Sequence, residues 1–151
     1  MPQLTIQGST FDYPDAGEEP GWGEDATAWA EAVTDVINFL VNPGDILETS
    51  FTLLDNTAVA ANVIGMRFDS SIVRAANVNY SINRNGANQS GTLHLNYNSS
   101  AAPGSKWTLQ ENTSGDVGVV FSVTDLGQVQ YTTSSTGFNG AIKFTARTLS
   151  Q

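Results

Sequence analysis

The sequence of 151 residues contains no cysteine, which excludes both a disulfide framework and a thiolate metal site. Charged residues are also scarce, at 14% of the chain against about 25% in a typical globular domain. With only six Lys and Arg residues, the chain lacks the basic clusters that bind phosphate, so we expect no nucleic-acid partner. No apolar run approaches the length of a membrane-spanning helix, so we expect no membrane partner either.

Lys and Arg are missing from the first 55 residues, although these hold eleven of the fifteen acidic residues. The rest of the chain carries the other four acids and all six bases. The formal net charge of −9 therefore originates from the N-terminal third. Such asymmetry within one chain is typical of an acidic segment with an interaction role of its own.

Residues 1–24 are predicted to form an extended acidic arm. Turns are expected at the YPD sequence of residues 13–15 and the PGWG sequence of residues 20–23, because proline fixes φ and restricts the residue before it. The arm nevertheless contains Phe11, Tyr13 and Trp22, and aromatic residues are depleted in disordered segments. We therefore predict that the arm packs on a partner surface.

The clearest local prediction is an amphipathic helix with its stop, over residues 25–43. Asp25 suits the N-cap position, and the NPG sequence of residues 42–44 ends the helix because the residue before proline avoids the α conformation. The helix itself is expected to span residues 26–41. Its apolar stripe, with steps of three and four residues, contains Trp29, Val33, Val36, Ile37 and Leu40.

Residues 44–151 are predicted to form one β domain, because the apolar period changes from 3.6 to 2 after Gly44. The cleanest strand places Ala76, Val78, Tyr80 and Ile82 in alternation with polar residues. Residues 57–68 add one or two weaker strands. The other alternating runs are Leu47/Phe51/Leu53, Leu93/Leu95/Tyr97, Trp107/Leu109, Val117/Val119/Phe121/Val123, Val129/Tyr131 and Ile142/Phe144/Ala146.

Turn-forming pairs separate these runs, among them Asn85-Gly86 and Asn139-Gly140. About eight short strands at this spacing are typical of an antiparallel β-sandwich or a jelly-roll-like barrel. The predicted fold class is therefore mainly β, with the N-terminal extended arm and one α-helix preceding the strands.

Catalysis is the weaker interpretation of the polar residues. His94 is the single histidine, and it lies on the face opposite Leu93 and Leu95 in its strand. The sequence also has no G-x-S-x-G motif that would supply a nucleophile for a histidine base. Glu111, Asp116 and Asp125 are the carboxylates that a glycosidase would require in pairs, but each stands beside turn-forming or small polar residues typical of solvated positions. We expect no enzymatic activity.

A bound metal or cofactor is not expected either. Asp12, Asp15, Glu18 and Glu19 are close in sequence, but they lack the spacing of a calcium-binding loop, and the prolines between them spread the carboxylates apart. We interpret these acids as solvated or facing a partner.

Two tryptophans have two interpretations each. Trp22 and Trp107 would suit a sugar-stacking platform, because an aromatic face packs well on a pyranose ring. Alternatively, Trp22 anchors the arm in a partner pocket and Trp107, two residues from Leu109, belongs to the core. We favour the anchor for Trp22 and the core for Trp107.

The arm and helix resemble the leader of tailed-bacteriophage virion proteins. The matching segments are FDYPDAGEEPGWGED at residues 11–25 and AWAEAVTDV at residues 28–36. The β portion of such proteins is similar to further segments of this chain: SIVRAANVNYSINR at 71–84, GTL at 91–93, GVVF at 118–121, GQVQY at 127–131 and IKFTARTL at 142–149. The resemblance implies a structural role in the virion and brings no catalytic residues with it.

Related segments occur in capsid decoration proteins, head fibres and tail-fibre-like proteins. Since no long shaft or receptor-binding head follows the β domain, we favour a capsid decoration (cement) protein, a homotrimer that binds the major capsid protein or other virion proteins. The alternative is a short tail-fibre or adhesin-like module that binds host glycans. The predicted partner-binding residues are Phe11, Tyr13, Pro14, Asp15, Trp22 and Trp29.

The expected location is the capsid surface of the virion. The residues after Met1 lack the basic and apolar regions of a signal peptide, so we expect synthesis in the host cytoplasm.

Overall fold

The computed structural model of the chain describes residues 3–6, 9–12, 27, 30–35, 37 and 42–151. The chain divides into two units, Met1–Asn42 and Pro43–Gln151. We call Pro43–Gln151 the β unit.

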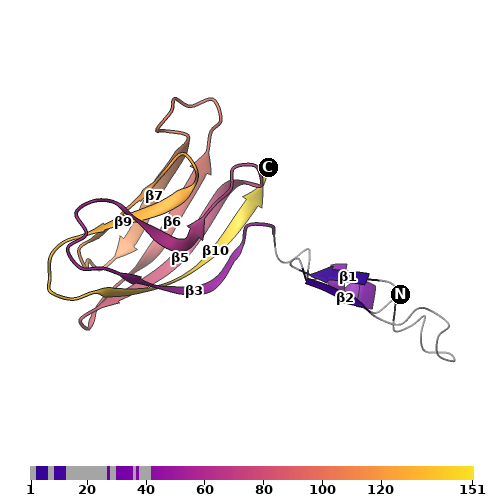
Figure 1. The fold of residues 1–151 in the computed structure, drawn as a ribbon, viewed down its shortest axis with the longest axis horizontal. Helices are drawn as coiled ribbons and strands as arrows, with labels where there is room; N and C mark the ends of the chain where they lie inside the picture. The colour runs from indigo at the N-terminus through magenta and orange to yellow at the C-terminus, as the bar shows by residue number, and fades with distance from the viewer. Residues whose placement is uncertain (1–2, 7–8, 13–26, 28–29, 36, 38–41) are drawn as a thin grey trace. The chain divides into compact units, whose positions relative to one another are not determined.

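The first unit contains a β-hairpin and helical residues. Strands β1 (Gln3–Ile6) and β2 (Ser9–Asp12) pair in antiparallel fashion (Figure 1). Their register places Leu4 opposite Phe11. The pairing of these two strands was not predicted, and residues 13–24 of the predicted arm lie outside the described residues. Residues 27, 30–35 and 37 are helical and fall within the predicted helix span. Thr34 is buried there, and its hydroxyl donates to the carbonyl of Ala30 at 2.8 Å.

The β unit is an antiparallel sandwich of eight strands (Figure 1), as predicted from the alternating runs. A five-stranded sheet has the order β3-β10-β5-β6-β7, and a three-stranded sheet has the order β4-β9-β8. The strands are β3 (Ile46–Leu53), β4 (Ala61–Arg67), β5 (Val73–Arg84), β6 (Ala87–Tyr97), β7 (Trp107–Ser114), β8 (Val119–Val123), β9 (Gln128–Thr133) and β10 (Gly140–Ser150).

The central hairpin of the larger sheet, β5–β6, follows directly from the sequence. Asn85 and Gly86 have φ values of 50° and 81°, the left-handed pair that a two-residue hairpin turn of matching twist requires. The turn sets the register, with Asn83 opposite Asn88, and burial then alternates along β5 as the sequence predicts.

The core lies between the two sheets. Aromatic pairs join the sheets edge to face: Phe51 meets Tyr131 with ring centroids 5.9 Å apart, and Tyr80 meets Phe121 at 5.2 Å. Side chains that are fully buried include Leu53, Val63, Met66, Phe68, Val73, Val78, Ile82, Leu93, Val129, Tyr131, Ile142 and Phe144.

Two local predictions are wrong, the first because a bulge changes the alternation along β3. Phe144 is opposite Thr49 while Ala146 is opposite Ile46, so β3 holds one extra residue. The bulge turns Leu47 outward, where it is 66% exposed, and Ile46 packs against the core in its place.

Residues 57–68 form one strand, β4, in which Val63 and Met66 are both fully buried. Positive φ at Gly65, +89°, allows this change of face. The side-chain amide of Gln128 donates to the carbonyls of Val63 and Met66, at 3.0 and 3.2 Å, which the irregular backbone leaves without a ladder partner.

The second wrong prediction is the turn at Asn139-Gly140. Gly140 is instead the first residue of β10, and the positive φ of this connection lies at Gly137, +82°. Asn139 has a different role, described below.

Candidate functional site

Four connecting segments meet at one end of the sandwich: residues 54–60, 85–86, 115–118 and 134–139. The strand pairing places them together, because Leu53 is opposite Gly140, Arg84 is opposite Ala87, and Val119 is opposite Thr133. We call this the loop end. The other end, where the chain enters the β unit at Pro43, is called the entry end and lies roughly 23 Å away along β3.

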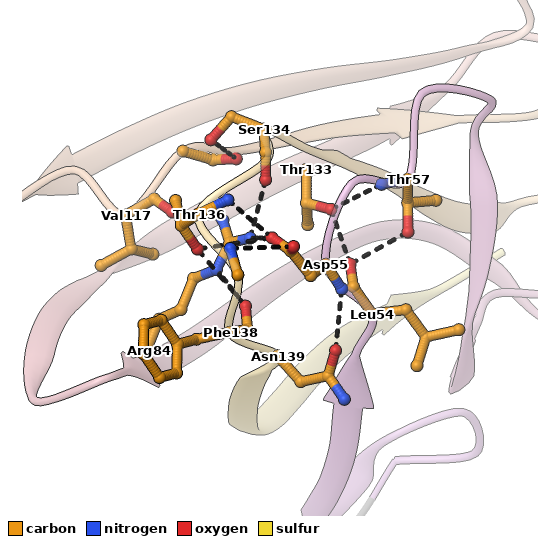
Figure 2. A network of polar contacts seen from close by, with 12 residues as sticks. Leu54, Asp55, Thr57, Arg84, Val117, Thr133, Ser134, Thr136, Phe138 and Asn139 are labelled. Atoms are coloured by element: carbon orange, nitrogen blue, oxygen red, sulfur yellow. Dashed lines mark hydrogen bonds and ion pairs between the residues drawn. The ribbon is translucent and has the colours of Figure 1, made fainter.

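Arg84 ties the loop end together. It is the last residue of β5 on the core-facing side, and its side chain is only 3% exposed. Nε donates to the carbonyl of Phe138 at 2.8 Å, Nη1 to that of Val117 at 2.9 Å, and Nη2 to that of Ser134 at 2.7 Å (Figure 2). Nη2 also forms an ion pair with the carboxylate of Asp55. One guanidinium thereby fixes three separate segments.

Asp55 completes this Arg84–Asp55 cluster from the β3–β4 connection. Its carboxylate accepts from the backbone N–H groups of Thr136 at 2.8 Å and Gly137 at 2.9 Å. Its own N–H donates to the side-chain oxygen of Asn139 at 2.9 Å (Figure 2). The Thr136 N–H is the strongest influence on the pKa of Asp55; with Gly137 and Arg84 it lowers that pKa below its ordinary value, against the opposing effect of desolvation.

Neither Arg84 nor Asp55 was among the predicted site residues. A signal for Arg84 was present, since it occupies the next apolar-face position after Ile82 in the alternation of β5. A charge at a core position requires partners, which predicts a buried polar cluster there. The identity of the partners depends on long-range pairing and was not available from the sequence.

A pocket of about 380 Å³ opens beside this cluster. Phe138 lines it and remains 49% exposed. The Asp116 carboxylate also lines the pocket and accepts a hydrogen bond from the N–H of Gly118 at 2.8 Å. Gly118 has a φ of +70°, and a Cβ there would come within 2.0 Å of the Ser134 hydroxyl oxygen, so the close approach of these loops requires glycine. Asn85, Ser134 and Thr136 also line the pocket.

A second polar cluster lies at the margin of the core. The hydroxyl of Tyr80 bonds to the carboxylate of Glu111 and lies 3.0 Å from the hydroxyl oxygen of Thr113. Gln89 donates to Tyr80 at 3.1 Å and accepts from the N–H of Val117 at 3.0 Å. Burial, followed by the bond to Glu111, raises the pKa of Tyr80.

The three carboxylates considered for catalysis are not brought together. Glu111 bonds to Tyr80, Asp116 caps the turn before β8, and Asp125 follows β8 at the entry end. Asp125 accepts from the N–H groups of Gly104 and Lys106, the former being the main cause of its lowered pKa. Within the described residues, no group of three or more His, Asp or Glu is placed to hold a metal ion.

His94 and Trp107 occupy their predicted environments. His94 is exposed on the outer face of the larger sheet, with Nδ1 2.6 Å from the side-chain oxygen of Asn77. Trp107 is buried and packs against Tyr97 and Phe68, with centroid distances of 5.2 and 6.4 Å. The interpretation of Trp107 as a sugar platform is therefore wrong, because its ring faces the core.

The predicted partner-binding residues belong to the first unit. The backbone of Phe11 lies in β2. Tyr13, Pro14, Asp15, Trp22 and Trp29 lie outside the described residues, so their role stays a prediction.

Among the described residues, no helix has the length and apolar character needed to cross a bilayer. The sequence matches no family model and no curated protein. A solved structure, the tailspike protein of Acinetobacter phage vB_ApiP_P1, is similar with a TM-score of 0.40 and 10% identity over 74% of this chain, and the match spans 21% of the tailspike.

Proposed function

We propose that this chain is a structural protein of a bacteriophage virion, a capsid decoration (cement) protein that binds the head surface through its N-terminal unit. The observation that carries the proposal is that the first structural unit is purely acidic among its Asp, Glu, Lys and Arg residues. Met1–Asn42 holds eight acids and no Lys or Arg, whereas Pro43–Gln151 holds seven acids and six bases. The leader that resembles phage virion proteins lies wholly in the acidic unit.

The β unit suits a structural role because its polar groups serve its own fold. The buried Arg84 has four partners, and Glu111, Asp116 and Asp125 each accept hydrogen bonds from the unit itself. Carboxylates held in this way fix loops and turns. This arrangement favours a rigid module over a catalytic one.

The acidic unit supplies the docking element in this proposal. An acidic, aromatic-bearing segment complements a basic groove on the major capsid protein: charge directs the encounter, and buried aromatic residues provide affinity. Phe11, Tyr13, Pro14, Asp15, Trp22 and Trp29 are the proposed contact residues, and a homotrimer is the proposed assembly.

Deletion of residues 1–24 tests the docking role. We expect the truncated protein to lose cosedimentation with capsids that lack the native protein, while its β unit keeps the thermal transition of the full chain. The matched control is a full chain with Glu48→Gln, which alters an exposed acid of the β unit outside the loop end and should sediment normally. Normal decoration by the truncated protein would overturn the proposal.

Light scattering on the purified full chain tests the assembly. We expect the mass of three chains, and a monomer at high concentration would contradict the homotrimer.

A further inference from the structure

We propose that the pocket at the loop end is a carbohydrate-binding site that takes a neutral pyranose residue. The inference goes beyond capsid docking and does not depend on it, because the pocket lies in the β unit at the end opposite Pro43. Three features carry it: an apolar platform, a polar rim, and a lining whose cation, Arg84, is already paired with Asp55.

The platform is Phe138. Almost half of this residue is exposed, although its carbonyl is held by Arg84 Nε at 2.8 Å, so an exposed ring stands on fixed backbone. One face of a pyranose ring consists mainly of C–H groups, which pack on an aromatic face. Ligand sites in general combine such apolar surface with a few placed polar groups.

The rim consists of polar side chains from three different segments. Asp116 uses one carboxylate oxygen to cap Gly118, and within the described residues its other oxygen has no hydrogen-bond partner. The hydroxyl of Thr136 makes only long contacts, of 3.4 Å to Asp55 and to the Phe138 carbonyl. With the Asn85 amide, these groups offer donors and acceptors to several sugar hydroxyls.

The charges at the pocket select against an anionic ligand. Arg84 lines the pocket, but its positive charge is paired with Asp55, and its donors are directed to three backbone carbonyls. The remaining charge is the carboxylate of Asp116. A phosphate or an acidic sugar would meet this carboxylate without a compensating cation, whereas a neutral sugar would use it as an acceptor.

The Arg84–Asp55 cluster makes the pocket preformed. Residues 134–139 receive hydrogen bonds from Arg84 and donate others to Asp55, so the loop that carries Thr136 and Phe138 is ordered before a ligand arrives. A preordered site avoids the entropic cost of fixing its loops on binding.

The test is a binding measurement on the full chain with defined sugars. The probes are methyl glycosides of glucose, galactose, mannose, rhamnose and N-acetylglucosamine in saturation-transfer NMR, together with an array of neutral bacterial oligosaccharides. We expect at least one probe to bind, and Phe138→Ala to weaken its affinity by about tenfold or more, as for a central aromatic contact. Asp116→Asn, which retains an oxygen to cap Gly118, should also weaken binding.

The matched control is Leu126→Ala, which removes an apolar side chain of 70% exposure at the entry end. This variant should bind like the original chain. Absence of binding by every neutral probe, or binding unaffected by both Phe138→Ala and Asp116→Asn, would overturn the proposal. Capsid cosedimentation of Phe138→Ala separates the two proposals. If this variant loses sugar binding but still sediments with capsids, the result supports the sugar pocket. If it no longer sediments with capsids, Phe138 faces the capsid instead.

Discussion

The two units of the chain differ most in how their charges are balanced. Every base lies in the β unit, and three of them pair with acids of the same unit: Arg84 with Asp55, Lys143 with Glu48, and Arg147 with Asp45. The first unit has eight acids and no Lys or Arg of its own. The comparison shows that acids of the β unit have Lys or Arg partners within that unit, whereas the sequence of the first unit offers its acids no Lys or Arg; in the proposal above, the partner protein supplies the opposite charge.

The largest expected effect concerns the first unit. Replacing Asp12, Asp15, Glu18 and Glu19 by their amides should slow association with capsids by about 10- to 1000-fold at low salt, because charge steers the encounter. The β unit should keep its melting temperature. Stopped-flow or biosensor kinetics at several salt concentrations measure the association rate, and calorimetry measures the melting temperature. A lowered melting temperature with an unchanged association rate would show that these acids stabilise the fold and do not act in capsid binding.

Arg84→Met should produce the largest loss of stability in the β unit. It removes all four interactions of the guanidinium and leaves Asp55 and three carbonyls without their partner. Since the Asp55 side chain is 21% exposed and keeps the N–H groups of Thr136 and Gly137, we expect a loss of about 3 kcal/mol of unfolding free energy, the lower end of the range for a broken buried pair. Urea denaturation measures it, and a loss below about 1 kcal/mol would mean that the cluster contributes little to the fold.

Tyr80→Phe should have an intermediate effect. The substitution keeps the ring contact with Phe121 and removes the hydroxyl from Glu111 and Gln89, which leaves the Gln89 amide with only the longer bond of 3.3 Å to Glu111. We expect a loss of about 1.5–3 kcal/mol, the contribution of a hydrogen bond to a charged group. Urea denaturation again gives the value, with Tyr97→Phe as a control, and equal stability of Tyr80→Phe and the original chain would contradict this reading of the cluster.

Acid should destabilise the β unit through Asp55. Because the pKa of Asp55 is lower in the folded state than the ordinary 3.8, its stabilising contribution is complete above 3.8 and is lost as the pH falls through the folded-state value. Asp69 and Asp125 have lowered pKa values as well and act in the same direction. Between pH 7 and pH 2, the melting temperature of Asp55→Asn should fall less than that of the original chain. If the melting temperatures of the two proteins fall in parallel, the Asp55 carboxylate does not have this role.

The smallest effect is expected at the surface. Lys143 and Glu48 lie 3.4 Å apart with side chains 67% and 68% exposed, so Lys143→Ala should change stability by no more than about 1 kcal/mol. Added salt should reduce this difference further. If Lys143→Ala lowers the free energy of unfolding as much as Arg84→Met does, burial does not explain the difference expected between the two ion pairs.

The sequence was sufficient for the parts of the fold that depend on local pattern. The alternation along β5 and the Asn85-Gly86 turn predict a hairpin, its register and its buried face, because each depends on neighbouring residues alone. Leu47 was misplaced because a bulge has no reliable local signature. The extra residue of β3 is apparent only from its pairing with β10.

The candidate site was less predictable, because its residues come from distant parts of the chain. Asp55, Arg84 and Asn139 meet only after β3, β5 and β10 have paired, so no spacing in the sequence relates them. Arg84 alone gave a signal, through its position on the apolar face of its strand. Phe138 gave none, since an exposed aromatic residue in a loop cannot be told from a core residue without the structure.

Electron microscopy of virions that carry a gold label at Gln151 tests the central claim most directly. We predict label density at regular sites on the head surface, absent when residues 1–24 are deleted. Label confined to the tail would contradict the decoration proposal and support the adhesin-like alternative.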